Sequence, residues 1–270
     1  MGAVGLVALV TSGCAPGAVR RQESARAAAS LPLPTLNAVV LQAVDDLPAG
    51  GGYGSRATGQ ALVDAIHIES DFRIEPAHAQ PSICSSATYL VLLRTLARLR
   101  DAGQLDVPLA ALQHLAPPAS IDSLFKDDGK GLWGRWNANG PGTAVLFREL
   151  GIGVNFTDWS KKRPGDFMKI WWTDAVGKKE RGHSVIYLDE RINPQTGIPE
   201  VLYFSSGKPH GYGRTWVARD KIVHALFSRL TAPENLARAA ALPMTDGYLA
   251  SLLTVESSFA EAKTQAGVSD

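Results

Sequence analysis

The sequence is short of cysteine and carries almost no excess of charge. It contains 2 cysteines in 270 residues, too few for a framework of disulfide bonds. The formal net charge is +1, from 27 basic and 26 acidic residues, and no basic block stands out. A balance of this kind gives no support for nucleic-acid binding.

Motifs for metals, nucleotides and serine hydrolases are also missing. The 6 histidines stand apart, with no His-x-x-x-His or Cys-x-x-Cys pair to hold zinc. No glycine-rich dinucleotide fingerprint and no Gly-x-Ser-x-Gly elbow occur. We therefore expect no cofactor, and a zinc site would have to be assembled from distant residues.

The apolar run at the start of the chain, residues 3–10, is too short to span a bilayer. It is typical of a bacterial secretory signal, and the small residues before Cys14 resemble a lipoprotein cleavage site. We expect residues 1–14 to be an export or lipoprotein signal, and residues 15–35, rich in Ala, Arg, Ser and Pro, to be a disordered tether. The protein would then reside in the periplasm or cell envelope, with lipid at Cys14 as its only membrane contact. An accidental apolar N-terminus is the alternative.

Cys84 would be the only cysteine left beyond a lipidated Cys14, and it opens an apolar segment. Apolar residues at helical spacing follow it, and Gly103 is a plausible terminator. A thiol in the first turn of a helix lies at the positive end of the helix dipole, which favours the thiolate. Further helices are expected over 37–45, 56–72, 109–115 and 143–150.

After residue 166 the pattern changes to that of strands. They are predicted over 167–172, 183–188, 201–205 and 212–217. From about residue 220 the pattern is again helical, with Leu226, Phe227 and Leu230 as core candidates. Helices first and an antiparallel sheet second predict an α+β fold, in one domain over residues 36–270.

Three short motifs follow one another along the chain: Ile83-Cys84-Ser85-Ser86, the turn Pro164-Gly165-Asp166-Phe167, and Gly182-His183-Ser184-Val185-Ile186-Tyr187-Leu188. Together they resemble the signature of NlpC-like and CHAP-like cysteine peptidases. These papain-like bacterial enzymes mostly cleave amide bonds in peptidoglycan. The resemblance covers about residues 81–207 and implies a papain-like fold, in which a helical half carrying the nucleophile packs on a small antiparallel sheet. Ile83 stands where the family usually has Asp, and Ser86 where it has Gly.

The chemistry assigns roles to the candidate catalytic residues. Cys84 would attack a carbonyl and form a thioester, while His183 would take or share its proton and then protonate the leaving amine. A third polar residue should orient the imidazole. In the resembled family it lies on the next strand, where Ser205 stands here; a backbone carbonyl or His210 are the alternatives. Asp166 is expected to cap its own turn.

The remaining candidates would bind substrate. The oxyanion hole would use the Cys84 amide and a second donor, either Tyr53 or Asn137. Trp136 and Asn137 belong to a predicted loop that is either a groove wall or an ordinary connection. Two further candidates are Ser206, next to Ser205, and His210, in the loop that follows.

These inferences predict an exported cysteine hydrolase that cleaves an amide bond, with peptidoglycan stem peptides as substrate, through a thioester acyl-enzyme. Two alternatives remain open. One is an acyltransferase on the same scaffold, in which an amine or alcohol replaces water. The other is a non-catalytic lipoprotein that binds cell-wall peptide and keeps a decayed site.

Overall fold

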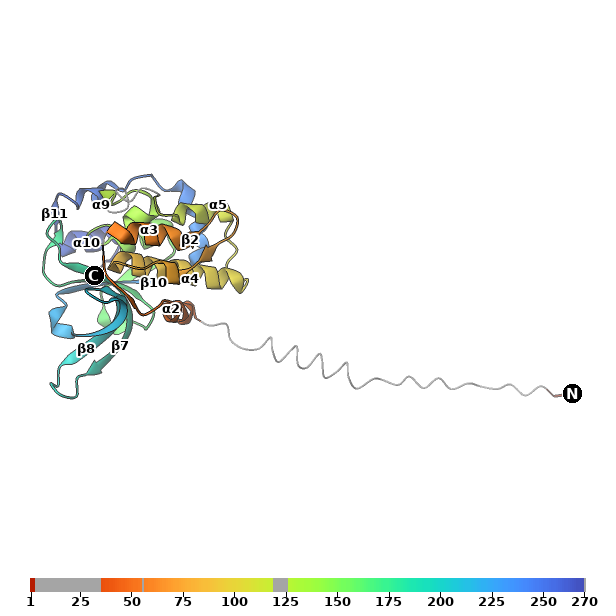
Figure 1. Cartoon of the computed structure of the whole chain (residues 1–270), viewed down its shortest axis with the longest axis horizontal. Coiled ribbons are helices and arrows are strands. Elements are labelled where there is room, and N and C mark those ends of the chain that lie inside the picture. Colours follow the sequence, from red (N-terminus) through yellow and green to blue (C-terminus); the bar gives the residue numbers. More distant parts are fainter. Residues whose placement is uncertain (3–34, 55, 119–125, 270) are drawn as a thin grey trace. The chain divides into compact units, whose positions relative to one another are not determined.

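The computed structural model describes residues 1–2, 35–54, 56–118 and 126–269. The predicted signal over 1–14 and tether over 15–35 therefore lie outside the described residues, except for Met1, Gly2 and Thr35. Thr35–Asp270 forms one compact unit. Helices and antiparallel sheet combine in this unit, so the α+β class predicted from the sequence is confirmed (Figure 1).

In the described residues the main sheet has seven strands, and all neighbouring strands are antiparallel. In spatial order they are β1 (Gly50–Gly51), β9 (Gly211–Ala218), β8 (Pro199–Gly207), β7 (Gly182–Ile192), β5 (Phe167–Trp171), β10 (His224–Leu230) and β4 (Gly153–Phe156). Two small antiparallel pairs lie outside this sheet. They are β2 (Ile66–His67) with β3 (Arg73–Ile74), and β6 (Val176–Gly177) with β11 (Glu256–Ser257).

The helices come mainly before the sheet in the chain. The α-helices are α2 (Leu36–Asp45), α3 (Arg56–Asp64), α4 (Cys84–Asp101), α5 (Leu109–Leu112), α7 (Gly131–Asn137), α8 (Gly142–Leu150), α9 (Gly247–Ser251) and α10 (Phe259–Gln265). The 3₁₀ turns are η1 (Pro76–His78), η2 (Gln113–Leu115), η3 (Trp159–Lys161), η4 (Arg219–Lys221) and η5 (Pro233–Ala241).

Helix α4 is the central helix of the domain. Of its 18 residues, 13 are buried, including a continuous run from Ser85 to Leu93. Burial of this many residues requires neighbouring elements on several sides of the helix. Strands β7 and β8 cover one side of α4, and helices α2 and α7 pack against others. The N-terminus of α4 is thereby held against the sheet.

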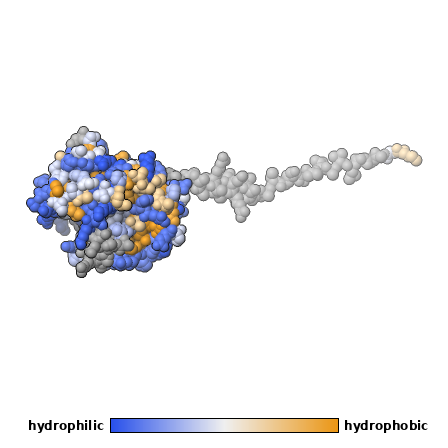
Figure 2. Space-filling model, turned by 90° about the horizontal axis from the view of Figure 1, so that it is seen from above, coloured by the Kyte–Doolittle hydropathy of each residue, from blue (hydrophilic) through white to orange (hydrophobic). Residues whose placement is uncertain are grey.

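Successive side chains of the sheet strands enter two hydrophobic clusters in turn, because neighbouring residues of a strand point to opposite faces of the sheet. Phe167, Ile186 and Phe204 belong to the cluster that contains α4. Their neighbours Met168, Val185 and Tyr203 belong to a cluster on the other face. On the outer surface, the face seen in Figure 2 shows hydrophobic residues scattered among hydrophilic ones.

Three predicted elements differ from the structure. The helix expected from about residue 220 is wrong, because His224–Leu230 forms the interior strand β10. The helix expected over 56–72 ends at Asp64 and is followed by the short strand β2. The loop expected from Trp136 begins later, since α7 continues to Asn137. Within the described residues, we find no helix with the length and apolarity needed to cross a membrane.

Candidate active site

Cys84 is the first residue of α4. The preceding residue, Ile83, is extended and serves as the N-cap, and its backbone amide donates to Ser86 Oγ at 3.0 Å. Cys84 is partly exposed and forms no disulfide. Its side chain therefore lies in the first helical turn, where the free amides favour a negative charge.

His183 is the second residue of β7, and its side chain is hydrogen-bonded to the Cys84 thiol. The backbone amide of Ser184 donates to the same sulfur. The structure thus brings together the two residues that the sequence predicts as nucleophile and base. Helix α4 supplies one and strand β7 the other, and the two elements are packed together (Figure 1).

The pKa of Cys84 reflects opposing effects. Burial of the sulfur raises it. The hydrogen bond and charge of His183, the Ser184 amide and the charge of Lys169 lower it more, and the result is a pKa of about 7. A large share of the thiol is therefore ionised at neutral pH, and the thiolate is the form that acts as a nucleophile.

Lys169 is a part of the site that the sequence did not point to. It lies on β5 directly opposite Ser184, and its Nζ is 2.7 Å from Glu180 Oε1. The side chains of both are largely buried, at 13% and 5% exposure. The other Glu180 oxygen accepts from the backbone amides of Gly140 and Gly177, which fixes the ion pair in place. A restrained cation therefore lies close enough to favour the Cys84 thiolate.

Two tyrosines are also close to the sulfur. The pKa of Tyr53 and that of Tyr203 are both raised, first by burial and then by the negative charge of Cys84. The rings of Tyr203 and His183 meet edge to face, with centroids 5.7 Å apart. At neutral pH both phenols are protonated, so each is available as a hydrogen-bond donor.

A glycine-rich loop places Tyr53. Gly50 and Gly51 form β1 and pair with β9, and Gly52 donates to the carbonyl of His210 at 3.1 Å. The packing is tight: a Cβ on Gly211, whose φ is +88°, would lie 2.2 Å from the Gly50 oxygen. Tyr53 itself bridges to Ser82, two residues before the nucleophile. The loop is thus fixed against both the sheet and the approach to α4.

Ser205 does not hydrogen-bond to the imidazole as predicted. It is 2% exposed, and its hydroxyl donates to the Ser184 carbonyl at 2.7 Å. In the described part of the chain no hydrogen bond joins it to the His183 ring. Ser205 therefore supports the backbone next to His183 instead of orienting the ring.

Two predicted substrate contacts are structural. Trp136 is 1% exposed and its indole donates to the Ser85 carbonyl at 3.0 Å, so it belongs to the core and cannot line a groove. Ser206 is fully buried and donates to the Ser82 carbonyl at 2.9 Å. Both hold the start of α4, Ser206 from the sheet and Trp136 from α7.

Asn137 forms a polar chain beside the nucleophile. Its Oδ1 accepts from Ser85 Oγ at 2.6 Å, and its Nδ2 donates to Asp128 at 3.3 Å. Asp128 is 4% exposed, and burial raises its pKa to about 6 despite the hydrogen bonds from Asn139 and Asn137. The sequence analysis did not single out Asp128, since its partners Asn137 and Asn139 come from a later segment of the chain.

His210 is exposed in the turn between β8 and β9. Its carbonyl holds Gly52, and Lys208 in the same turn lies over the Tyr53 ring, with Nζ 5.5 Å from the centroid. A role for the His210 side chain in substrate binding stays a prediction.

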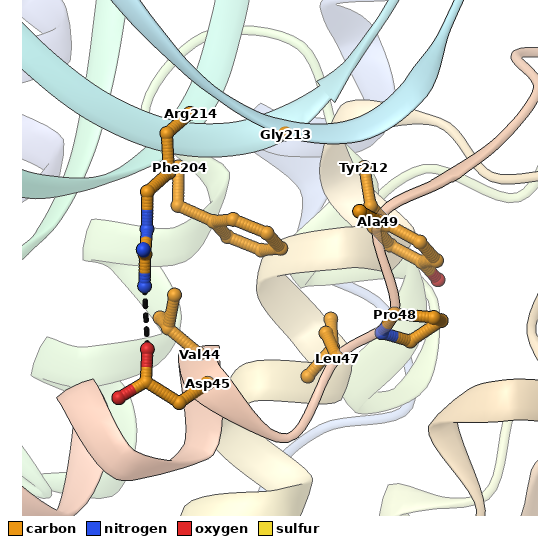
Figure 3. Close-up of a pocket in the computed structure, with 9 residues that line it drawn as sticks. All are labelled: Val44, Asp45, Leu47, Pro48, Ala49, Phe204, Tyr212, Gly213 and Arg214. Carbon is orange, nitrogen blue, oxygen red and sulfur yellow. Dashed lines mark hydrogen bonds and ion pairs between the residues drawn. The ribbon is translucent and has the colours of Figure 1, made fainter.

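A separate cavity of about 370 Å³ lies between the end of α2 and strands β8 and β9 (Figure 3). Leu47, Phe204 and Tyr212 line it, and Arg214 pairs with Asp45 at one side. Neither Cys84 nor His183 lines this cavity. In the described residues, no group of three or more His, Cys, Asp or Glu side chains could hold a metal ion.

The comparisons with known proteins give no relative: no family model matches the chain, and no curated protein or solved structure matches it.

Proposed function

We propose that the protein is an exported cysteine hydrolase with a papain-like fold, related to the NlpC-like and CHAP-like peptidases. The observation that carries the proposal is the contact of Cys84 with His183, at the start of a helix and the start of a strand. The thiol has a pKa of about 7, as a nucleophile working at neutral pH requires. An amide in peptidoglycan stem peptides is the proposed substrate, because of the resembled motifs and the apolar start of the chain.

The proposed reaction begins with the Cys84 thiolate attacking the amide carbonyl carbon. The protonated His183 ring then gives its proton to the leaving nitrogen as the carbon–nitrogen bond breaks, and a thioester remains. His183 next removes a proton from water, which attacks the thioester. The products are a carboxylic acid and the free thiol, which shares its proton with His183.

Tyr53 is the stronger of the two proposed oxyanion donors. Its phenol lies near the sulfur and is protonated at neutral pH, and burial and the charge of Cys84 raise its pKa further. Asn137 already uses both ends of its amide, one for Ser85 and one for Asp128. The backbone amide of Cys84 would supply the other donor.

The test is digestion of purified peptidoglycan fragments, with products identified by mass spectrometry. The native protein should release a free carboxylic acid and amine, whereas Cys84→Ala should release neither and should unfold at nearly the same temperature. A product joined to an added amine would instead identify an acyltransferase. Full activity in the alanine variant would refute the assignment of the nucleophile.

A further inference from the structure

A cavity at the far edge of the main sheet is surrounded by cations. It has a volume of about 580 Å³ and lies beside the edge strand β4. Its eight lining residues are Val154, Asn155, Phe156, Ser160, Lys161, Lys162, Arg163 and Arg229. Four of them are cations and none carries a carboxylate, which is the lining expected for an anionic ligand.

Arg229 is held rigidly at the wall of this cavity. Its Nε and Nη2 donate to the buried carboxylate of Asp166 at 2.8 and 2.7 Å, and Nη2 also donates to the Lys161 carbonyl at 2.6 Å. Asp166 in turn accepts from the Arg163 backbone amide at 2.7 Å, which caps its turn as the sequence predicts. The Arg229 guanidinium also lies over the Phe156 ring, with Cζ 5.1 Å from the centroid, and in the described residues its Nη1 group has no hydrogen-bond partner. An anion would meet a donor whose position is already fixed.

Two of the other cations are only weakly compensated. Lys161 is 67% exposed and its Nζ is 3.7 Å from Asp158, which is a weak surface pair. The exposed Arg163 side chain has no hydrogen-bond or ion-pair partner within the described part of the chain. Lys162 differs, because it pairs with Glu190 at 3.0 Å and lies near the rings of Trp159 and Tyr187. Lys161, Arg163 and Arg229 are therefore the available donors.

We propose that this cavity binds a phosphate group carried by a larger organic molecule. Several converging cations suit the multiple oxygens and charge of a phosphate better than a single carboxylate. The apolar wall formed by Val154 and Phe156 would contact the rest of the ligand. A soluble phosphate ester and a phospholipid headgroup share this chemistry. The inference does not depend on the proposed function, since no residue of the cavity belongs to the candidate active site.

Titration calorimetry of the full chain with glycerol 3-phosphate at low ionic strength tests the soluble source. Sedimentation with phosphatidylglycerol vesicles, against phosphatidylcholine vesicles, tests the lipid source. The test variant is K161Q/R163Q, which removes two exposed charges and leaves Arg229 and Asp166 in place. The matched control is K178Q/K179Q, which removes two exposed charges elsewhere.

We expect the native protein and the control to bind one of the two probes alike, and the test variant to bind at least tenfold more weakly. Binding of glycerol 3-phosphate would identify a soluble ester, and binding of phosphatidylglycerol vesicles alone a lipid headgroup. Equal binding by all three proteins, or no binding of either probe by the native protein, would overturn the proposal. Binding of only an oligothymidylate, added as a third probe, would also overturn it and indicate nucleic acid.

Discussion

Lys169 on β5 is the direct cross-strand partner of Ser184 on β7, whose backbone amide donates to the Cys84 sulfur. The pairing of two strands thus determines the distance between a buried ammonium group and the proposed nucleophile. Glu180 pairs with this ammonium group. The electrostatic setting of the thiol is a property of the sheet as much as of the helix.

Removing the positive charge of Lys169 should make the Cys84 thiol less acidic. Burial raises the pKa of Cys84, and His183, the Ser184 amide and Lys169 lower it to about 7. The variant K169Q/E180Q keeps the net charge and avoids an unpaired buried carboxylate, and its Cys84 pKa should rise. The rise should be smaller than in H183Q, because His183 both hydrogen-bonds to the sulfur and adds a charge.

The measurement is the rate of iodoacetamide alkylation as a function of pH. In H183Q the rate at pH 7 should fall by about tenfold or more, because the thiol loses the group that lowers its pKa most while burial, which raises that pKa, remains. Exposed Lys178 provides the control, since K178Q should leave the curve in place. An unchanged midpoint in both H183Q and K169Q/E180Q would mean that these cations do not act on the sulfur.

Asp128 should make the stability of the fold depend on pH. Burial raises its folded-state pKa from 3.8 to about 6, so the folded state holds this proton more tightly than the unfolded state does. Its contribution to stability is therefore fully present below about pH 4 and is lost as the pH rises towards 6. The loss amounts to at most about 3 kcal/mol.

Denaturant unfolding of native protein and D128N at pH 4 and pH 7 checks this expectation. The unfolding free energy of D128N, relative to that of the native protein, should be higher at pH 7 than at pH 4. The surface variant D101N should show no such shift, because Asp101 is exposed at the end of α4. A difference that does not change with pH would contradict a raised pKa for Asp128.

The loop that carries Tyr53 should be sensitive to one methyl group. In Gly211→Ala, a Cβ would lie 2.2 Å from the Gly50 carbonyl, at a φ of +88°. We expect a loss of roughly 1–3 kcal/mol in unfolding free energy and a displaced Tyr53. Gly213→Ala on the same strand is the matched control, since a Cβ there meets nothing within 4 Å. The thermal unfolding temperature and the hydrolysis rate should both be unchanged in the control, and both should be lower in Gly211→Ala.

Ser205→Ala should affect stability more than chemistry. The substitution removes a buried 2.7 Å hydrogen bond to the Ser184 carbonyl, at a cost of about 1 kcal/mol. Because the hydroxyl donates to a backbone carbonyl and not to the ring, we expect only a small loss of hydrolysis rate. A loss as large as that of His183→Ala would instead make Ser205 the residue that orients the imidazole.

The sequence predicted helix α4 and strands β5, β7, β8 and β9 because each has a clear period or a continuous apolar run. It predicted β10 as a helix for a physical reason. Leu226 and Phe227 are consecutive and both are buried, in clusters on opposite sides of the strand. A strand covered on both faces loses the alternation that identifies strands.

The residues of the candidate site were likewise predicted only in part from the sequence. Cys84 and His183 were predicted because each stands in a short motif of its own. Asp128 and Lys169 were not, since each acquires its role only when other segments fold against it. The same holds for Arg229, which joins the Lys161–Arg163 turn only through the pairing of distant strands.

The irregular pairing of β7 with β8 divides their hairpin into two parts. The register shifts between Tyr187 and Asp189, so the strand pair slips by one residue around Leu188. His183 and Ser205 lie on the inner side of this slip, and the exposed tip at residues 194–198 lies on the outer side. The tip is therefore a natural point for inserting a fluorescent label or affinity tag, because strain introduced there would be absorbed before it reached the imidazole.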